Sequence, residues 1–497
     1  MGVAPVTRPD PTTLGRTDSW EGVRAVVAGF GTSGAAAVDN LLHLGASVHA
    51  LAESAHPRIL ERAELLEVLG ATIEIHAGAT DALPAEADLL VVSPGFRPDA
   101  PLIAAARERG IPVWGEVELA WRLRDPAHPA PWLCVTGTNG KTTTVQMLDS
   151  ILRAAGLRSV AAGNVGLPLT EAVMDPEPYD VIAVELSSFQ LHYTDTMAAE
   201  SAVVLNVAED HLDWYDGPTG MDDYARDKGR IFQNVARACV YNVADPVTED
   251  LVREADVIEG ARAIGFTLGT PAVGMLGVVE DILVDRAFIE QRDTSAAELC
   301  TLDDLASTAP HFVANALAAA ALARAHGVSQ AAVRDGLRAF RPDGHRIAVV
   351  AEHDAVTWVD DSKATNPHAA ASSLAAFAPV VWVAGGLAKG AHFDDLVSAT
   401  ADRLRAVVLI GRDRQVIADA LSRHAPDVPV FQVETPETGG AVGDDLMRRV
   451  VATAAEVAQP GDTVLLAPGC ASMDQFTDYA ARGDAFATAV REHVGTS

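Results

Sequence analysis

The chain is poor in cysteine, and the four cysteines that it has are scattered. None of them stands in C-x-x-C spacing, so the sequence indicates neither a zinc site nor a disulfide framework. A reducing cytoplasm is therefore the expected compartment. The four residues are Cys134, Cys239, Cys300 and Cys470.

Long hydrophobic runs are also missing. The longest mostly apolar stretch begins at Phe312, but it contains Asn315 and Arg324 and is too short and alanine-rich to span a bilayer. The opening residues are polar and rich in proline, and they lack the apolar core of a signal peptide. We therefore expect no membrane partner and a disordered tail over residues 1–20.

Positive charge is scarce. The chain has 37 basic and 68 acidic residues, which gives a net charge of −31. So acidic a chain repels the phosphate backbone of a nucleic acid, which argues strongly against nonspecific binding to nucleic acid. An anionic substrate would require lysine, arginine or a metal ion concentrated at its site.

Lysine is especially rare. Only four of the 37 basic residues are lysine, so the other 33 are arginine. Arginine fills the positions where a solvated positive charge suffices, and lysine remains where a compact ammonium, or an amine able to lose its proton, is needed. Chance would account for one such residue more easily than for four in motif-like stretches: Lys141, Lys228, Lys363 and Lys389.

Short apolar runs alternate with helical patterns along most of the chain. Such runs suit parallel strands buried on both faces, and their alternation with helices predicts doubly wound α/β sheets with ligands beyond the carboxyl ends of the strands. A chain of 497 residues is too long for one core. Two proline-bearing connectors divide it into three α/β domains, which we predict at residues 21–126, 127–341 and 342–497.

The segment GFGTSG places Gly29, Gly31 and Gly34 in G-x-G-x-x-G spacing between a strand and a helix. This spacing is typical of a Rossmann dinucleotide site, and Glu53 lies near the expected acidic position. Backbone amides at a helix N-terminus hold any nucleotide diphosphate equally well, and a purely structural turn is a further alternative. We favour a diphosphate site without assigning NAD to it.

The segment TGTNGKTTT follows a predicted strand and precedes a predicted helix. It departs from the usual phosphate-loop spelling, because Val135 stands where the first glycine is expected. Gly137 and Gly140 nevertheless allow backbone amides to converge on phosphate oxygens. Lys141 can reach the terminal phosphates, and the Thr142 hydroxyl is a potential Mg²⁺ ligand. A structural turn needs no Gly-Lys-Thr combination, so a nucleotide loop is the better interpretation.

Polar side chains follow two further strands. Glu185 is a candidate Mg²⁺ ligand, or else part of a region in which Ser187 and Ser188 cap a helix. His211 stands among acidic residues, which alone more often marks a solvated turn than a metal site. Two such strand ends beside a phosphate loop favour the metal interpretation. Lys228 lies in a predicted acidic helix, either as a plain surface residue or, given how rare lysine is, as an amine with a chemical task.

Together these segments resemble the Mur ligases, the ATP-dependent amide-forming enzymes of peptidoglycan precursor synthesis. The motifs follow the family's order from about residue 22 to the C-terminus, and Val135 is the expected residue in the family's loop, G-T-N-G-K-[ST]. The resemblance implies a Rossmann-like N-terminal domain for a UDP sugar, a central phosphate-loop ATPase domain and a mobile, Rossmann-like, amino-acid-binding C-terminal domain. The motifs are TGTNGKTTT, AGNVG, ELSSFQL, LNVAEDHLDWY, DKGRIF, HFVANALAAAALA, GHR, DDSKATNP and APGCASMDQF.

The resemblance also implies cofactors and catalytic residues. Lys228 matches a family lysine that reacts with CO₂ to form a carbamate, which only an amine can do. The implied catalytic residues are Lys141, Glu185, His211 and Lys228. The implied ligands of two Mg²⁺ ions are Thr142, Glu185, His211 and carbamylated Lys228. The implied ATP-binding residues are Gly137, Thr138, Asn139, Gly140, Lys141, Thr142, Thr143, Asn315, Arg346 and Asp361.

Two substrates are implied, UDP-N-acetylmuramoyl-L-alanine and D-glutamate. Glu53 follows a strand that lacks the family's frequent Asp, so no uracil contact is assigned to it, and none of the roles falls to His392, which stands where Asp is frequent. The implied UDP-sugar-binding residues are Gly31, Thr32, Ser33, Ser93, Gly95 and Asn164. The implied D-glutamate-binding residues are Lys363, Thr365, Lys389, Ser472 and Tyr479.

ELSSFQL and CASMDQF resemble the D-glutamate-adding members of the family. They imply a ligase that activates the alanyl carboxylate as an acyl phosphate, which the amine of D-glutamate attacks to give a tetrahedral intermediate. We expect the protein to be a monomer, although no motif determines its oligomeric state. Another Mur ligase or a folylpolyglutamate synthase-like enzyme is the alternative within this class. A nucleotide-binding regulator would not need Lys228, Lys363 and Lys389 together, and an NAD-dependent oxidoreductase would leave TGTNGKTTT unexplained.

Overall fold

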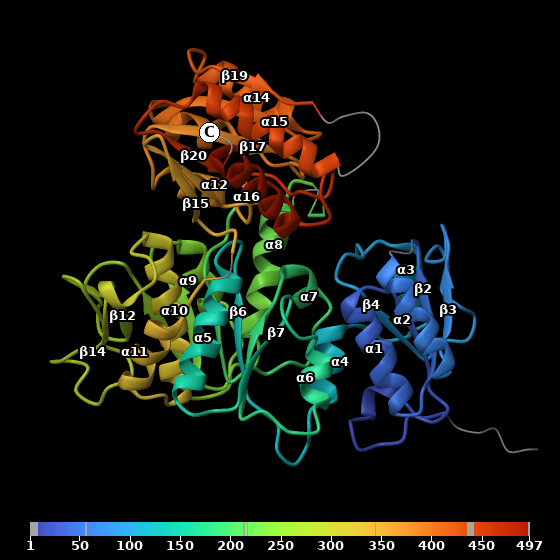
Figure 1. Ribbon diagram of the computed structural model, residues 1–497. Coiled ribbons are helices and arrows are strands. Elements are labelled where there is room, and N and C mark those ends of the chain that lie inside the picture. The colour runs from blue at the N-terminus through green and yellow to red at the C-terminus, as the bar shows by residue number, and fades with distance from the viewer. Residues whose placement is uncertain are drawn as a thin grey trace, which may run out of the picture. The chain divides into compact units, whose positions relative to one another are not determined.

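The computed structural model describes residues 8–54, 57–211, 214–215, 217–342, 344–434 and 442–495. Three sheets are present, with helices packed against each of them (Figure 1). The predicted α/β class with mostly parallel sheets is confirmed. The chain forms two compact units, Met1–Val207 with Asp222–Phe340 and Ala208–Met221 with Arg341–Ser497.

The first sheet has five parallel strands in the order β3-β2-β1-β4-β5. Successive residues of β1 point to opposite faces, so Val26 packs in the core beneath α3 while Val27 packs in the core beneath α1. Burial on both faces is why this strand is a continuous apolar run. The elements are β1 (Arg24–Ala28), α1 (Thr32–His43), β2 (Ser47–Ala52), α2 (Pro57–Val68), β3 (Thr72–Ile75), β4 (Leu89–Val92), α3 (Pro101–Glu108), β5 (Val113–Gly115) and α4 (Glu116–Arg122).

The central sheet has nine strands in the order β14-β13-β12-β11-β10-β9-β6-β8-β7, and only the β12-β13 and β13-β14 pairs are antiparallel among them. The alanine-rich helix α10 is buried on nearly every side, because its small side chains let it lie close to α5 and to the sheet. The strands are β6 (Trp132–Thr136), β7 (Ser159–Gly163), β8 (Val181–Glu185), β9 (Ser201–Val204), β10 (Ala238–Asn242), β11 (Arg262–Phe266), β12 (Met275–Val279), β13 (Ile282–Asp285) and β14 (Ala297–Thr301). The helices are α5 (Lys141–Ala154), α6 (Leu169–Met174), α7 (Ser188–His192), α8 (Gly220–Gly229), α9 (Pro246–Arg253), α10 (Pro310–His326) and α11 (Gln330–Ala339).

The third sheet has the order β15-β16-β20-β17-β18-β19, with β15 antiparallel at one edge. Its parallel strands end at loops that carry several predicted site residues, as the doubly wound topology requires. The elements are β15 (Ala348–His353), β16 (Val356–Asp360), α12 (Pro367–Leu374), β17 (Val380–Gly385), α13 (Asp394–Thr400), β18 (Leu404–Ile410), α14 (Arg414–His424), β19 (Val430–Gln432), α15 (Val442–Val457), β20 (Thr463–Leu466) and α16 (Tyr479–Gly495).

Residues 8–20 are ordered, whereas the sequence suggested a disordered tail over residues 1–20. Trp20 is fully buried and donates from its indole nitrogen to a main-chain carbonyl at 3.1 Å. Arg16 donates to the carbonyl oxygen of Val173 in the central domain at 2.8 Å. One buried aromatic ring and hydrogen bonds to distant residues thus hold a polar, proline-rich segment against the first unit. The first seven residues lie outside the described part of the chain.

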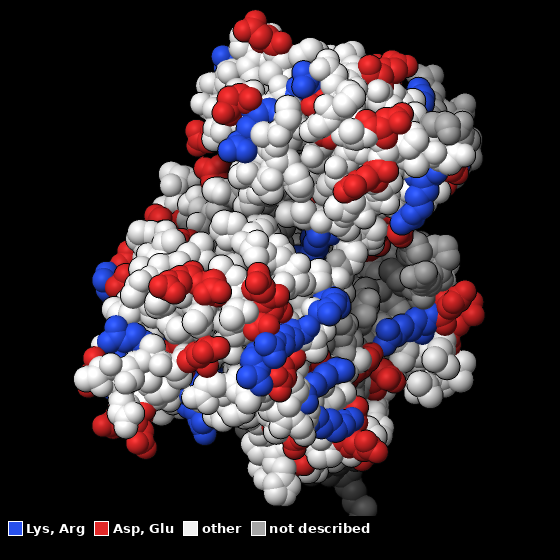
Figure 2. Space-filling view, turned by 60° about the vertical axis from the view of Figure 1, so that its left-hand side comes forward, with Lys and Arg blue, Asp and Glu red and all other residues white. Residues whose placement is uncertain are grey.

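The acidic excess of the sequence is distributed over the surface. On the face drawn in Figure 2, acidic side chains are spread over both units with basic ones between them. Among the helices of the described residues, none combines the length and the hydropathy that a membrane span requires.

Two buried glutamates lie in α4, which packs against α6. Glu116 accepts hydrogen bonds from the main-chain N–H and hydroxyl of Thr170, and its second carboxylate oxygen is buried without a partner. Burial outweighs these bonds and raises the pKa of Glu116 to about 7. Burial would also raise the pKa of Glu118, but hydrogen bonds from Thr196 and Asp195 outweigh it and lower that pKa.

Replacing Glu116 with glutamine is expected to stabilise the protein at pH 8 and to change its stability little at pH 5. The folded-state pKa of Glu116 lies above its ordinary value, so stability falls as the pH rises from about 4.5 to about 7. Glutamine stays uncharged throughout and avoids a loss of at most roughly 3 kcal/mol. Thermal unfolding at the two pH values measures the difference. Glu118→Gln is the matched control with the opposite sign, and a Glu116→Gln protein that melts earlier at pH 8 contradicts the prediction.

Candidate functional site

The phosphate loop joins β6 to α5 and is shaped by two glycines. Gly137 and Gly140 have positive φ angles of 156° and 83°. A Cβ atom at Gly140 would lie 2.4 Å from Oδ1 of Asn315, so glycine lets α10 approach the loop. Lys141 begins α5, and its ammonium donates to the carbonyl oxygens of Gly137 and Thr138 at 2.8 and 2.9 Å. The structure therefore brings these five predicted ATP-binding residues together.

Asn206, which follows β9, holds the loop from its other side. Its side chain accepts from the main-chain N–H of Asn139 at 2.8 Å and donates to the carbonyl oxygen of Asn139 at 3.1 Å. Its own carbonyl accepts from the N–H of Thr138 at 3.0 Å. The sequence prediction missed Asn206, although an amide directly after a buried strand was a usable signal. Thr142 and Thr143 are buried in the first turn of α5.

Glu185 ends β8, the strand beside β6, and only one of its two carboxylate oxygens accepts a hydrogen bond. Oε1 accepts from Nδ2 of Asn164 at 2.8 Å, while Oε2 is buried without a hydrogen bond. Ser187, not Glu185, caps α7, so helix capping does not account for this carboxylate. A buried oxygen without a partner is costly unless an ion pairs with it, and Glu185 therefore fits a Mg²⁺ ligand. No group of three or more His, Cys, Asp or Glu in the described part of the chain is placed to hold a metal ion.

Lys228 is buried on α8, with 2% of its surface exposed, which excludes the plain surface interpretation. Its ammonium donates to the carbonyl oxygen of Gly137 at 3.1 Å and lies 4.4 Å from the ring centre of Tyr224. The hydroxyl of Tyr224 lies 3.1 Å from that of Thr138. Because Lys141 contacts the same carbonyl oxygen of Gly137, two ammonium groups lie close together beside the phosphate loop. Tyr224, one helical turn before Lys228, was not among the predicted site residues.

The second unit brings together the residues predicted to bind D-glutamate. The ammonium of Lys363 lies 3.8 Å from the ring centre of Tyr479, and Thr365 follows in the same loop. The residue two positions before Lys389 exchanges two main-chain hydrogen bonds of 2.9 Å with the residue before Ser472. Lys389 itself has a left-handed backbone, with φ of 51°. Segments after three strands, β16, β17 and β20, thus carry this cluster of predicted residues.

Three other predicted site residues belong to this second unit. Asp361 is buried, and burial raises its pKa to about 7 although the Ser373 hydroxyl and the charge of Arg346 oppose the shift. His211 has a positive φ of 57°, and its main-chain N–H donates to the carboxylate of Asp210 at 2.9 Å. Nε2 of His211 lies 3.6 Å from the other oxygen of the same carboxylate.

In the glycine turn after β1, two glycines are closely packed and one faces open space. A Cβ atom at Gly29 would lie 2.3 Å from Oγ of Ser93, and one at Gly34 would lie 2.0 Å from a main-chain oxygen. Nothing lies within 4 Å of the corresponding position at Gly31, the N-cap of α1. The outer glycines therefore serve close packing, and the middle one leaves room for an anion at the helix N-terminus. The other predicted UDP-sugar residues here are Thr32 and Ser33 in the first turn of α1 and Gly95 after β4.

Glu53 binds the loop that follows β3. Its carboxylate accepts from the main-chain N–H of Gly78 at 2.8 Å, from that of Thr80 at 3.0 Å, and from the Thr80 hydroxyl. These hydrogen bonds lower the pKa of Glu53. A carboxylate committed to protein donors is not the ribose ligand of an NAD site, which counts against the oxidoreductase alternative.

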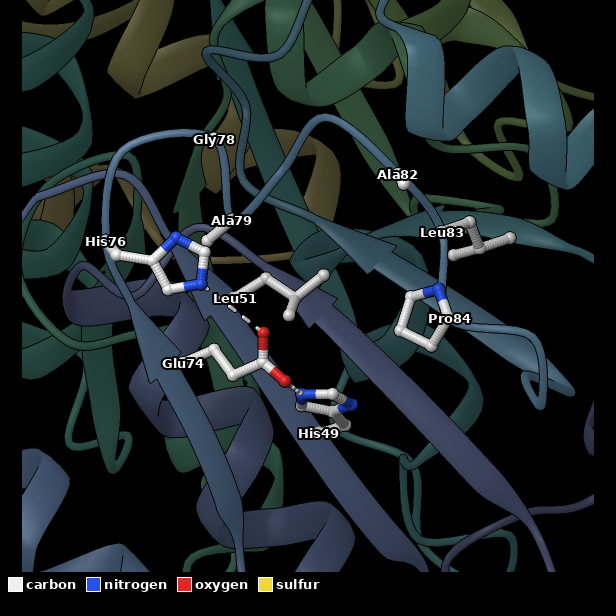
Figure 3. Close-up of a pocket in the computed structure, with 9 residues that line it drawn as sticks. All are labelled: His49, Leu51, Glu74, His76, Gly78, Ala79, Ala82, Leu83 and Pro84. Atoms are coloured by element: carbon white, nitrogen blue, oxygen red, sulfur yellow. Dashed lines mark hydrogen bonds and ion pairs between the residues drawn. The ribbon is translucent and has the colours of Figure 1, made fainter.

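A pocket of about 330 Å³ opens beside this loop, against β2 and β3 (Figure 3). Glu74 lies between two histidines, with Oε1 3.0 Å from Nε2 of His49 and Oε2 3.6 Å from Nε2 of His76. None of the predicted UDP-sugar residues lines it, so the pocket is separate from the candidate site. The other lining residues are Leu51, Gly78, Ala79, Ala82, Leu83 and Pro84.

Three segments of the chain match models of known protein domains. Residues 135–323 match the Mur ligase middle domain, residues 345–470 the Mur ligase, glutamate ligase domain, and residues 23–115 the Mur ligase MurD-like N-terminal domain.

The chain is similar over nearly its whole length to curated bacterial proteins. It is 59% identical to the UDP-N-acetylmuramoylalanine--D-glutamate ligase of Streptomyces avermitilis, covering 95% of this chain and 99% of the relative. It is 46% identical to the protein of the same name from Mycolicibacterium smegmatis, covering 95% and 97%.

Solved structures share the fold. UDP-N-acetylmuramate-alanine ligase MurC from Thermotoga maritima superposes with a TM-score of 0.54 at 19% identity, covering 96% of this chain and 100% of that one. MurF from Acinetobacter baumannii superposes with a TM-score of 0.57 at 18% identity, covering 91% of each chain.

Proposed function

The chain belongs to the Mur ligase family, and from that premise we propose that it is the ATP-dependent ligase that adds D-glutamate to UDP-N-acetylmuramoyl-L-alanine. The observation that carries this proposal is the identity of 59% to a D-glutamate ligase, which covers 95% of this chain and 99% of the relative. The reaction forms a carbon–nitrogen bond in peptidoglycan precursor synthesis, and through the cell wall it serves cell shape and division.

The first step joins two anions, because the alanyl carboxylate must attack the γ-phosphate of ATP. The amides of the Gly137–Gly140 turn and the ammonium of Lys141 are fixed before ATP binds, so they stabilise the phosphate charge without reorganisation. Mg²⁺, when bound, neutralises further phosphate charge, and Glu185 and Thr142 are the residues that would hold it. Asn315, packed on Gly140, borders the same loop and suits the adenine side.

Lys228 supports this step as a carbamate. Its neutral amine attacks the carbon of CO₂, an N–C bond forms while one C=O π bond breaks and its electron pair passes to oxygen, and one proton leaves the nitrogen for water. The product carries a carboxylate where the ammonium was, so the repulsion between Lys228 and Lys141 beside Gly137 is replaced by attraction. The new oxygens would also be candidate ligands for Mg²⁺.

The second step needs D-glutamate held by its two carboxylates with the amine exposed to the acyl phosphate. Lys363 and Lys389 are the cations of this cluster, and Ser472 and Thr365 add hydroxyl donors. The ring of Tyr479 faces the ammonium of Lys363 and limits where it can lie. The amine of D-glutamate then attacks, and the tetrahedral intermediate expels phosphate.

We propose a cytoplasmic monomer. All four cysteines are free and buried, as expected in a reducing compartment. Every residue assigned to ATP, the UDP sugar and D-glutamate comes from this one chain, so a second copy is not needed to complete a site.

Phosphate release separates this function from the alternatives. With ATP, Mg²⁺ and UDP-N-acetylmuramoyl-L-alanine present, adding D-glutamate is expected to start steady release, whereas L-glutamate, L-lysine and meso-diaminopimelate are not. Omitting the UDP substrate is the control for hydrolysis of ATP alone. Release that proceeds equally with every amino acid, or with none, overturns the proposal.

A further inference from the structure

Arg482, in the first turn of α16, is a buried cation. It is 1% exposed and forms no ion pair with any described residue. Its side-chain N–H groups donate only to neutral oxygens. Nε donates to the hydroxyl of Ser362 at 2.9 Å, Nη2 to the carbonyl of Ser362 at 2.8 Å, and Nη1 to the carbonyl of Cys470 at 3.1 Å.

A buried guanidinium would be energetically unfavourable if Arg482 served only to pack α16 against the sheet. Removing a guanidinium from water is unfavourable, and burial lowers the pKa of Arg482 to about 10 although the nearby Cys470, Asp474 and Asp360 oppose the shift. The docking of α16 has its own apolar contacts, since Phe486 and Val490 are fully buried in the core on that side of the sheet. Arg482 is therefore not needed to supply hydrophobic anchoring.

The three acceptors of Arg482 lie next to residues assigned to D-glutamate. Ser362 directly precedes Lys363, and Cys470 lies two residues before Ser472. The hydroxyl of Ser362 also donates to the carbonyl of Tyr479 at 2.7 Å. One planar guanidinium thus joins segments that lie more than a hundred residues apart in sequence, and a lysine could not reach all three oxygens at once.

We propose that Arg482 is a positioning residue for the amino-acid substrate, which sets the spacing of Lys363, Ser472 and Tyr479 without touching D-glutamate itself. This inference rests on the proposed function. It assigns Arg482 a specific consequence, because a looser cluster weakens the binding of D-glutamate and leaves the sites for ATP and the UDP sugar as they are.

Steady-state kinetics of Arg482→Lys tests the proposal. The KM for D-glutamate is expected to rise about tenfold or more, because the hydrogen bonds of a charged group are lost. The KM values for ATP and for UDP-N-acetylmuramoyl-L-alanine are expected to stay within about twofold. Arg405→Lys is the matched control. Arg405 donates to both oxygens of Asp462 at 2.7 and 3.0 Å in the same unit, but near the amino-terminal ends of the strands.

Each kinetic result either supports the role of Arg482 or contradicts it. An Arg482→Lys enzyme with the wild-type KM for D-glutamate overturns the inference while the proposed function stands. A rise of equal size in all three KM values, or the same rise in Arg405→Lys, also overturns it. If Arg482→Lys does not fold, Ser362→Ala decides, since it removes the hydroxyl shared by Arg482 and Tyr479 and is expected to raise the same KM. A wild-type enzyme indifferent to D-glutamate overturns the proposed function and this inference together.

Discussion

Replacing Lys228 with arginine is expected to lower kcat by about a thousandfold, although the positive charge is kept. The buried position of Lys228, its contact with Gly137 and its closeness to Lys141 all suit an amine that becomes an anion. A guanidinium cannot form the carbamate, and it would hold a second permanent cation beside Lys141. The measurement is phosphate release at saturating substrates, with circular dichroism to verify folding.

Arg226→Lys provides the matched control for this prediction. Arg226 lies two residues away on the same helix, is exposed, and pairs with Asp223, so its replacement is expected to leave kcat unchanged. Two independent readouts support the carbamate itself. Removing CO₂ and bicarbonate is expected to lower turnover of the wild-type enzyme, and ¹³CO₂ is expected to give a carbamate signal that Lys228→Arg lacks. An active Lys228→Arg enzyme would falsify the carbamate proposal.

The fold was predictable where a strand is buried on both faces of its sheet, because such a strand has a continuous apolar sequence. The segments RAVVAG, DVIAVE and VVWVAGG each contain a strand that has a neighbouring strand on both sides in its sheet. The antiparallel strands β12, β13 and β14 were not identified, because they mix buried and partly exposed positions and have no such run. The ordered segment at residues 8–20 was missed because one buried tryptophan outweighs a disorder-like composition.

The site was predictable where its residues share a local motif. Gly137, Gly140 and Lys141 lie within five residues of one another, so their closeness in the loop follows directly from the sequence. Asn206 and Arg482 could not be found in this way, because they act on residues 67 and 120 positions away. A hydrogen bond across such a distance leaves no local pattern. The assigned roles and the domain boundaries stay predictions.

Replacing Glu185 with glutamine is expected to lower kcat by about two to three orders of magnitude and to raise the Mg²⁺ concentration needed for half-maximal rate. Glutamine keeps the oxygen that accepts from Asn164, so the side chain can stay in place. What it loses is the charge at the buried oxygen that has no protein partner. Asn164→Ala is the comparison, since losing only the group that orients Glu185 is expected to cost about tenfold.

Thermal unfolding makes this last prediction sharper, because the same substitution should act in opposite directions on the two forms of the protein. Without Mg²⁺ and nucleotide, Glu185→Gln is expected to melt later than wild type, since a buried carboxylate with an oxygen that accepts no hydrogen bond is gone. With saturating Mg²⁺ and ATP, the melting temperature of wild type is expected to rise more than that of Glu185→Gln, because ligands that bind only the folded state raise its stability. A Glu185→Gln protein that melts earlier in both conditions indicates a structural role for the carboxylate. If the variant keeps the wild-type Mg²⁺ dependence, Glu185 is not a ligand of the metal. A variant that melts later than wild type without Mg²⁺ and ATP, but earlier with them, identifies a carboxylate that destabilises the free protein and binds the ion.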